Sequence, residues 1–346
     1  MSKKKLPDIA QGGSGAPGAT SYDVAELAGV SQSAVSRAFR KGASIAPKTR
    51  EKIMRAAQQL GYQPNAFARG LITRRTNLVA VVISNLTNLY YPEVLAELTQ
   101  RLSATGHRVL LFSLAAESEI DEMLGLIWPY RVDGAIIAAR LKDEQIRQFH
   151  DRGIPIILYN RVGEAEPAAS VACDSAAGTR ELVKRLLAAG HRRFGIIAGP
   201  QDSYVGEERL DSARRHLAAA GIEPLIHRGG FDYRSGEEGL RALMERAGGE
   251  LDAVIATNDA MAMGAIDCAR ATYDLALPDQ LSIVGFDGVG PATWGGYQLT
   301  TIRQPVRRMA QAAVDMLIER IEQPGMIPEQ RLFGGELLPG RSARLG

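Results

Sequence analysis

The segment Thr20-Ser21-Tyr22-Asp23-Val24-Ala25-Glu26-Leu27-Ala28-Gly29-Val30-Ser31 predicts the fold of the N-terminal part of the chain. Thr20 and Asp23 have the spacing of a capping box, with Asp23 where Glu or Gln is commoner. The apolar residues that follow, Leu27 among them, recur at the spacing of one buried helical face. Gly29 lacks a Cβ and so allows the tight turn that ends this first short helix.

Two more helices are predicted downstream. Ser31 can cap a helix that runs to Phe39, and two short helices joined through a glycine form a helix-turn-helix. A third helix has Pro47 in its first turn and Gly61 just beyond its end, and we expect Leu60 on its buried side.

The polar face of the second helix is suited to DNA. Its side chains can hydrogen-bond base edges or phosphates if the helix enters the major groove. These residues are Gln32, Ser33, Ser36 and Arg37. Any small helical bundle could present such a face, so the pattern alone leaves a structural explanation open.

The net charge of +2 conceals an asymmetry between the two ends of the chain. Residues 1–75 hold 13 Lys or Arg and 4 Asp or Glu, a balance of +9, which leaves −7 for residues 76–346. A small basic module on a larger acidic body favours a polyanion as partner of the first part and a different partner for the second. Basic residues that merely solubilise a tail are the alternative.

Several of these segments together resemble the signature of the lactose and galactose repressor (LacI/GalR) family of transcription regulators. The matching segments are Tyr22-Asp23-Val24-Ala25, Ala28-Gly29-Val30-Ser31, Val35-Ser36-Arg37, Lys48-Thr49-Arg50-Glu51-Lys52-Ile53 and Leu60-Gly61-Tyr62-x-Pro64-Asn65. Their order and spacing match without a gap. One departure is Ala46, where the family usually has a capping Ser or Asp before the third helix; we expect Pro47 to offset part of the lost cap.

The resemblance implies roles in DNA binding. Gln32, Ser33 and Arg37 would read bases, with Tyr22, Ser31, Ser36 and Asn65 closer to phosphates. Residues 65–72 are too short to hold a helix alone in water. In the family the matching segment, here including Ala68, Arg69 and Leu71, forms a hinge helix in the minor groove, where the leucine wedges between base pairs. An ordinary flexible linker is the alternative.

The larger part of the chain alternates short aliphatic runs with amphipathic stretches, which predicts two similar sets of parallel strands and helices. The runs that we interpret as buried strands are residues 78–83, 108–112, 135–138, 154–159, 194–197, 225–227, 253–256 and 282–286. Polar residues follow several of these runs, at the strand ends where open α/β sheets bind ligands. Each could instead be an ordinary capping or turn residue.

The family resemblance continues over nearly the whole chain, in segments such as Gly190-His191-Arg192-Arg193, Thr257-Asn258-Asp259 and Leu299-Thr300-Thr301-Ile302-Arg303-Gln304-Pro305. It implies an effector-binding core similar to periplasmic sugar-binding proteins. The implied effector residues are Asp287 and Arg209, which would clamp hydroxyl or anionic groups, Phe231, which would stack on a ring, and Asn160, Asn258, Tyr90 and Tyr91. Ser212 departs from a frequent family glycine, which puts the shape of the pocket in doubt.

The predicted organisation is an α/β protein with an all-α helix-turn-helix domain and a two-lobed core of doubly wound parallel sheets. We expect a disordered extension over residues 1–19, the helix-turn-helix over 20–64, a hinge over 65–75 and the core over 76–346. The N-lobe would take about 76–174 and 305–333, and the C-lobe about 175–304 and 334–346, because the family resemblance implies that the amphipathic helix over 305–321 returns to the first lobe. Helices over 91–104 and 261–272 would form a homodimer, unless they simply face the core.

The function that we predict is a sequence-specific transcription regulator, most simply a repressor. It would bind a near-palindromic double-stranded operator as a dimer, under allosteric control by a small polar metabolite such as a sugar or sugar acid. We expect no cofactor or metal, because Cys173 and Cys268 share no CxxC spacing and the five histidines are scattered. Without an apolar signal or an 18-residue apolar stretch, the prediction is cytoplasmic.

Two other classes of protein have sequence features that can be compared with this chain. A sugar-binding receptor whose N-terminal helices have no DNA role would need an export signal, and its N-terminal part would need no basic charge. An enzyme on a doubly wound fold would carry a nucleophile or phosphate motif, and the sequence has no GxxxxGK[ST], HExxH or GxSxG. Distant residues can still meet in a fold, so catalysis is left open.

Overall fold

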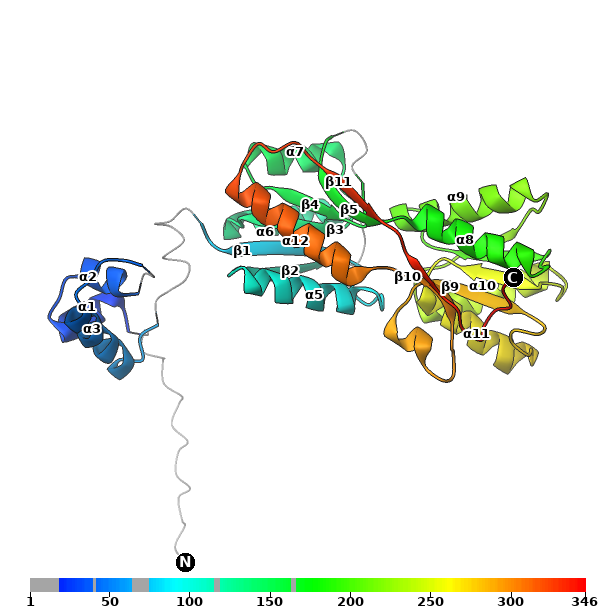
Figure 1. Cartoon of the computed structure of the whole chain (residues 1–346), viewed down its shortest axis with the longest axis horizontal. Coiled ribbons are helices and arrows are strands. Elements are labelled where there is room, and N and C mark those ends of the chain that lie inside the picture. The colour runs from blue at the N-terminus through cyan, green and yellow to red at the C-terminus, as the bar shows by residue number, and fades with distance from the viewer. Residues whose placement is uncertain (1–18, 40–41, 64–74, 115–118, 163–165) are drawn as a thin grey trace, which may run out of the picture. The chain divides into compact units, whose positions relative to one another are not determined.

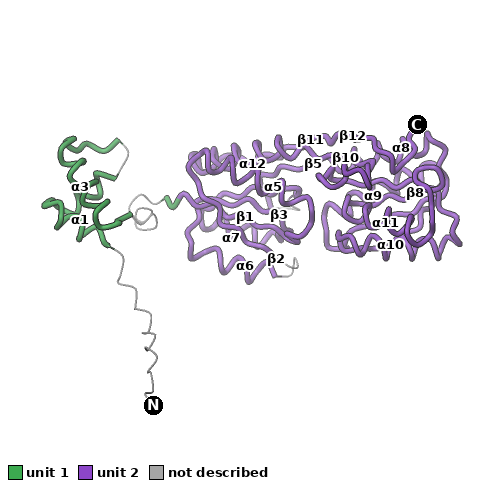
Figure 2. The backbone as a smooth tube through the Cα atoms, turned by 90° about the horizontal axis from the view of Figure 1, so that it is seen from below, with its two compact units in different colours: residues 1–76 green, residues 77–346 purple. Residues whose placement is uncertain are grey.

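The computed structural model describes residues 19–39, 42–63, 75–114, 119–162 and 166–346. The chain divides into two compact units, residues 1–76 and 77–346, and each is described by itself (Figure 2). The predicted N-terminal extension lies outside the described residues except for Ala19, and so does the hinge except for Arg75. No helix in the described ranges is long and apolar enough to cross a membrane.

The first unit contains the predicted helix-turn-helix and a third helix. These are α1 (Ser21–Ala28), α2 (Gln32–Ala38) and α3 (Pro47–Gln59). Thr20 and Asp23 form the capping box, in which the Asp23 carboxylate accepts from the Thr20 backbone N–H at 2.7 Å. Gly29 closes α1 with a φ of 59°, and Ser31 caps α2, as predicted.

The core of this unit is smaller than the sequence pattern suggested. Val24, Val35 and Ile53 are almost fully buried where the three helices meet. Leu27 and Leu60 were expected to share this core, but their exposures of 51% and 37% show that the expectation was wrong. Neither leucine belongs to the cluster of buried residues where the three helices meet.

The second unit is built from two six-stranded sheets that form two lobes (Figure 1). The N-lobe strands are β1 (Leu78–Ser84), β2 (Arg108–Leu114), β3 (Gly134–Ala138), β4 (Ile156–Tyr159), β5 (Ala169–Cys173) and β11 (Gln330–Phe333). The C-lobe strands are β6 (Phe194–Ala198), β7 (Leu225–Arg228), β8 (Ala253–Ala256), β9 (Ser282–Asp287), β10 (Thr300–Arg303) and β12 (Glu336–Leu338). The aliphatic runs interpreted as strands did not include the short strands β5, β10, β11 and β12.

Helices cover both faces of each sheet. In the N-lobe, α5 (Tyr91–Ala104) and α12 (Val306–Glu322) lie on one face, and α6 (Ile120–Ile127) and α7 (Asp143–Asp151) on the other. Alternate residues of β1 face these two layers: Val79, Val81 and Ile83 belong to the core with α5, and Ala80 and Val82 to the core with α6 and α7. In the C-lobe, α8 (Ser175–Ala188) and α9 (Tyr204–Ala219) pack together, as do α10 (Tyr233–Arg246) and α11 (Asp259–Tyr273).

The strand order runs β11-β5-β4-β3-β1-β2 in one sheet and β12-β10-β9-β8-β6-β7 in the other. The sheets are parallel as predicted, with one exception: the edge strand β12 is antiparallel to β10. The reason is the route of the chain. The other C-lobe strands run toward the junction between the lobes, whereas the chain leaving β11 enters the C-lobe from that junction.

Two predicted buried strands are only partly buried. β2 and β7 each lie at the edge of a sheet, and Leu111 in β2 is 41% exposed. An aliphatic run predicts a strand, but it does not tell whether that strand has a neighbour on both sides.

The chain crosses between the lobes three times, after β5, after β10 and between β11 and β12 (Figure 1). The second crossing leads into α12, the predicted amphipathic helix, which packs on α5 in the N-lobe. These crossings bring the carboxyl ends of both sheets to the same junction.

Two glycines allow α10 and α11 to touch through their backbones. A Cβ at Gly264 would lie 2.0 Å from the Tyr233 carbonyl oxygen, and a Cβ at Gly236 would lie 2.1 Å from that of Met261. Ten of the residues of α11 are buried within the chain. For this helix the structure therefore favours the core-facing alternative over the predicted dimer contact.

We predict that Gly264→Ala lowers the free energy of unfolding by about 2–3 kcal/mol, because the added methyl group forces two helices apart. Gly125→Ala is the matched control, since no atom lies within 4 Å of its added Cβ in α6. It should be neutral or stabilising by about 0.4–1 kcal/mol. Thermal melting of the full chain measures both, and equal melting temperatures would contradict the close contact.

Candidate functional site

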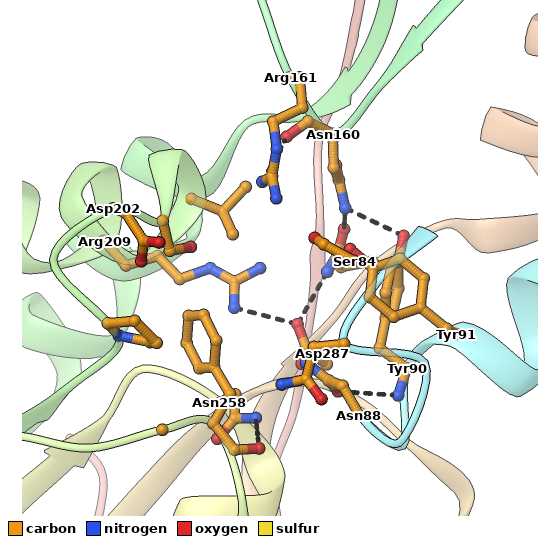
Figure 3. A pocket seen from close by; sticks show the side chains of 17 residues that line it. Ser84, Asn88, Tyr90, Tyr91, Asn160, Arg161, Asp202, Arg209, Asn258 and Asp287 are labelled. Atoms are coloured by element: carbon orange, nitrogen blue, oxygen red, sulfur yellow. Dashed lines mark hydrogen bonds and ion pairs between the residues drawn. The ribbon is translucent and has the colours of Figure 1, made fainter. Parts of the chain in front are cut away.

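A cavity of about 250 Å³ lies between the two lobes, at the carboxyl ends of their strands (Figure 3). Its lining comes from the segments that follow β1, β4, β6, β7, β8, β9 and β10. Parallel strands all point their carboxyl ends to one edge, so polar residues far apart in sequence meet here.

The structure brings all seven residues implied as effector contacts to this one cavity. They are Tyr90, Tyr91, Asn160, Arg209, Phe231, Asn258 and Asp287. At least one of these residues also has an ordinary structural role, because the side-chain oxygen of Asn258 caps the N-terminus of α11. Capping and lining the cavity are compatible, since a helix that begins at a strand end has its N-cap at the cavity wall.

A buried ion pair forms the floor of the cavity. Arg209 Nη1 lies 3.0 Å from Asp287 Oδ1, and both side chains are less than 5% exposed. The Arg209 guanidinium stacks 3.8 Å above the Phe286 ring and donates to the Thr257 carbonyl at 2.7 Å. Burial raises the pKa of Asp287, and the Arg209 charge opposes that rise. The pair therefore presents a fixed acceptor and a fixed donor edge to a ligand.

A chain of buried hydrogen bonds continues from Asp287 into the other lobe. Gln304 donates to Asp287 Oδ1 at 2.8 Å, and Asn160 donates to Gln304 Oε1 at 2.8 Å and to the Tyr90 hydroxyl at 3.1 Å. The Asn160 oxygen in turn accepts from the Cys173 backbone N–H at 3.0 Å. The amides of Asn160 and Gln304 are thus engaged in holding the two walls of the cavity together.

Phe231 is seated against glycines on the C-lobe wall. A Cβ at Gly199 would lie 2.3 Å from the Phe231 ring, and one at Gly206 would lie 3.1 Å from it. The Asn258 amide donates to the Phe231 carbonyl at 2.9 Å. The ring is therefore held in one place, with a face available to a flat or ring-shaped ligand.

Strained backbone is concentrated around the cavity. Asn85, Asn160, Phe231 and Asp287 follow β1, β4, β7 and β9 or end them, and their φ angles are 55°, 52°, 63° and 118°. Such angles are uncommon for asparagine and outliers for a bulky residue such as phenylalanine. Backbone strain of this kind persists where the surroundings impose it, which is typical of ligand sites.

Asp259 is one of the polar residues that follow the predicted strands, where they were expected as candidate ligand contacts; the structure instead places its carboxylate behind the strained turn. Its carboxylate accepts from the Thr301 hydroxyl at 2.6 Å and from the Val289 N–H at 2.8 Å, and it is fully buried. Gly285 leaves the space that this carboxylate occupies. Burial raises the pKa of Asp259 well above its ordinary value, and the Asp287 charge raises it further.

The sequence reasoning gave no role to several lining residues, among them Ser203, Asp202 and Gln304. Gln304 follows β10 just as the predicted residues follow their own strands. The same rule, applied to the aliphatic run before residue 303, would have found it. Arg161 follows β4, is 6% exposed, and points into the cavity with Arg209 (Figure 3).

The first unit presents the implied DNA-contacting residues that the structure describes on its surface. Those residues are Tyr22, Ser31, Gln32, Ser33, Ser36 and Arg37, and all are exposed. Ser31 is partly engaged, because its hydroxyl accepts from the Ala34 N–H at 3.3 Å. Asn65, Ala68, Arg69 and Leu71 lie outside the described residues.

A helix-turn-helix with an exposed polar helix, on the same chain as a two-lobed binding core, defines a ligand-responsive class of DNA-binding transcription regulators. Residues 20–65 match the model of the bacterial regulatory proteins of the lacI family, and residues 183–343 match a periplasmic binding protein-like domain. The regulator CelR of Thermobifida fusca is 35% identical over 86% of this chain and 90% of its own length. The chain belongs to the lacI family of bacterial transcription regulators.

Solved structures agree with this assignment. The Lac repressor dimer bound to operator and the anti-inducer ONPF has a TM-score of 0.84 and is 27% identical, over 94% of this chain and 99% of that one. The CelR–cellobiose complex has a TM-score of 0.71 and is 32% identical, over 94% of this chain and 100% of that one. The fold of two parallel-sheet lobes and an N-terminal helix-turn-helix is thereby confirmed.

We predict that Asp259→Asn gains stability relative to the wild type as pH rises from about 4 to 8. The folded wild type keeps this carboxyl protonated to a higher pH than the unfolded chain does, so its stability falls as pH rises above the unfolded pKa, whereas asparagine stays neutral. The amide can donate to Thr301 while its oxygen accepts from Val289. Melting temperatures across the pH range measure the difference. Ser212→Ala, which removes another hydrogen bond in the same lobe, should show a constant difference.

Proposed function

We propose that this regulator binds a near-palindromic operator as a homodimer and that a small polar, carbohydrate-like metabolite in the inter-lobe cavity controls that binding. The observation that carries the proposal is the cavity itself, which pairs a buried Arg209–Asp287 couple with the seated Phe231 ring. A regulator of chromosomal DNA works in the cytoplasm.

The first unit supports the DNA-binding part. We propose that α2 enters the major groove and that Gln32, Ser33 and Arg37 read bases, with Tyr22, Ser31 and Ser36 near phosphates. Exposure of all six side chains supports this assignment. Asn65, Ala68, Arg69 and Leu71 are proposed to contact the minor groove and its phosphates as a hinge.

The chemistry of the cavity supports a hydroxylated ligand. Asp287 offers a carboxylate to hydroxyl donors, Arg209 offers N–H donors beside it, and Phe231 offers a ring face. We propose these three as the main contacts, with Asn160, Asn258, Tyr90 and Tyr91 completing the wall. The relative CelR was solved as a complex with cellobiose, which supports a carbohydrate as the effector class.

An exposed face of α5 supports the dimer. It forms a shallow, mostly apolar groove lined by Pro92, Leu95, Ala96, Thr99, Gln100, Ser103 and Ala104. In a twofold interface the same face of each subunit meets its copy, and an exposed apolar face suits such a contact. The similar Lac repressor structure is a dimer on operator. A dimer would place two recognition helices about one helical turn, ~34 Å, apart.

Control would be reciprocal. An effector that binds one lobe arrangement more tightly shifts the population toward it, and that arrangement changes the affinity for operator by the same factor. We propose repression as the output, because a protein seated on an operator blocks transcription without any further contact.

Arg37→Ala should weaken operator binding by about 1–3 kcal/mol and relax the base preference. The matched control is Arg55→Ala, which removes the same charge from the exposed side of α3. Fluorescence anisotropy with operator and mutated operator DNA separates the two. If both variants lose the same operator affinity and keep the base preference of the wild type, Arg37 contributes only its charge and does not read bases.

Asp287→Asn should abolish the response to sugar while operator binding in the absence of sugar persists. Removing one partner of a buried charged contact costs about 2–5 kcal/mol of binding. A thermal-shift panel of sugars, sugar acids and sugar phosphates, cellobiose included, first identifies the responding compound. Asp211→Asn, on an exposed position two residues beyond Arg209, is the control and should respond as the wild type does.

A further inference from the structure

Arg303 is the last residue of β10, at the point where the chain leaves the C-lobe for α12. In the register of the sheet it lies opposite Asp287. Its side chain therefore starts beside the residue that we propose as the main effector contact.

The Arg303 side chain supports the turn that follows Asp287. Its Nη1 donates to the Gly288 carbonyl at 3.2 Å. A Cβ at Gly288 would lie 2.6 Å from both Cα and Cβ of Arg303, so the turn rests directly on the stem of this side chain. Gly288 has a φ of 68°, which also favours glycine. Asp259 holds the same turn from the other side through the Val289 N–H.

The same guanidinium reaches the other lobe. Arg303 Nη2 donates to Glu93 Oε1 at 3.1 Å, and Glu93 is the third residue of α5. The residues just before it, Tyr90 and Tyr91, line the cavity. One side chain thus connects the effector turn of the C-lobe with the helix of the N-lobe that both lines the cavity and carries the proposed dimer face.

This connection differs from the buried link through Gln304 and Asn160. Arg303 is 40% exposed and Glu93 is 36% exposed, so water can replace either partner at small cost. An ion pair of this strength biases an equilibrium between lobe arrangements without locking it. Asp287 and its turn would keep their support from Asp259 when the pair opens.

We propose that Arg303 is a positioning residue that couples the Asp287–Gly288 turn to α5 of the other lobe through its pair with Glu93. The role of the turn in effector binding rests on the proposed function. The physical link between the turn and α5 does not, and it can be tested on the protein without any sugar.

The test is hydrogen–deuterium exchange of the full, sugar-free protein. Glu93→Gln and Arg303→Gln should both speed exchange at the first turn of α5 and at residues 288–290, by roughly two- to fivefold. Exchange in the double variant should be no faster than in Arg303→Gln alone, because both changes remove the same ion pair. Glu93→Gln leaves the Gly288 contact in place, so it tests the coupling even if Arg303→Gln folds poorly.

The control is Glu207→Gln. Glu207 pairs with Arg228, and their side chains are 34% and 38% exposed, similar to Glu93 and Arg303. Arg228 also donates to a glycine carbonyl, as Arg303 does. Both residues of this pair belong to the C-lobe, so the pair does not join the two lobes. This variant should leave exchange at α5 unchanged. Unchanged exchange at residues 288–290 in Glu93→Gln, or an additive double variant, would overturn the proposal.

Operator and sugar binding then separate this proposal from the proposed function. With the sugar found in the thermal-shift panel, Glu93→Gln should shift the concentration needed for response by roughly two- to fivefold, and Glu207→Gln should not. The variants could show the expected exchange while the protein responds to no compound of the panel. This result would contradict the carbohydrate effector and would still support the link between the turn and α5. A response that is unaltered in Glu93→Gln would overturn the role of the link in regulation.

Discussion

Three passages of the chain between two parallel sheets set the geometry on which the other features depend. Because parallel strands end at one edge, and because the lobes are joined at that edge, the two sets of carboxyl ends face each other across the junction. The cavity, its polar lining and the turns with positive φ all follow from this arrangement. The antiparallel strand β12 follows from it as well, since it enters the C-lobe from the junction.

The junction combines rigid and breakable contacts. The Arg209–Asp287 pair, the Gln304 and Asn160 amides and the Asp259 carboxylate are buried, and their polar atoms find partners within the chain. Such a network costs desolvation and backbone strain, which the surrounding aliphatic sheets offset. In exchange, the polar groups of the candidate ligand site are already in place before a ligand binds. The Glu93–Arg303 pair is half exposed, so it is suited to a contact that changes with the arrangement of the lobes.

Helix α5 contributes to three features of the proposed regulator. Its N-terminal residues line the cavity, Glu93 reaches the other lobe, and its outer face is apolar and open. Under the proposed function, α5, a helix of 14 residues, would transmit binding in the cavity to the surface proposed for a second subunit. Coupling of this sort needs an element with two arrangements that both sites bias, and α5 is the element that we propose for this role.

The sequence by itself determined the local structure: the Thr20 capping box, the Gly29 turn, the strand-helix alternation and the polar residues after strands such as Asn160, Asn258 and Asp287. These features depend on backbone conformation and on the period of apolar residues, which neighbours in sequence control. Only the tertiary structure decided that β2 and β7 are edge strands, that Leu27 and Leu60 are exposed, and that α11 is covered by α10. It alone brought Asp259 to the Val289 N–H and Arg303 to Glu93, since those contacts join residues 30 and 210 positions apart in the chain. Burial and pairing depend on what packs alongside, and no local pattern carries that information.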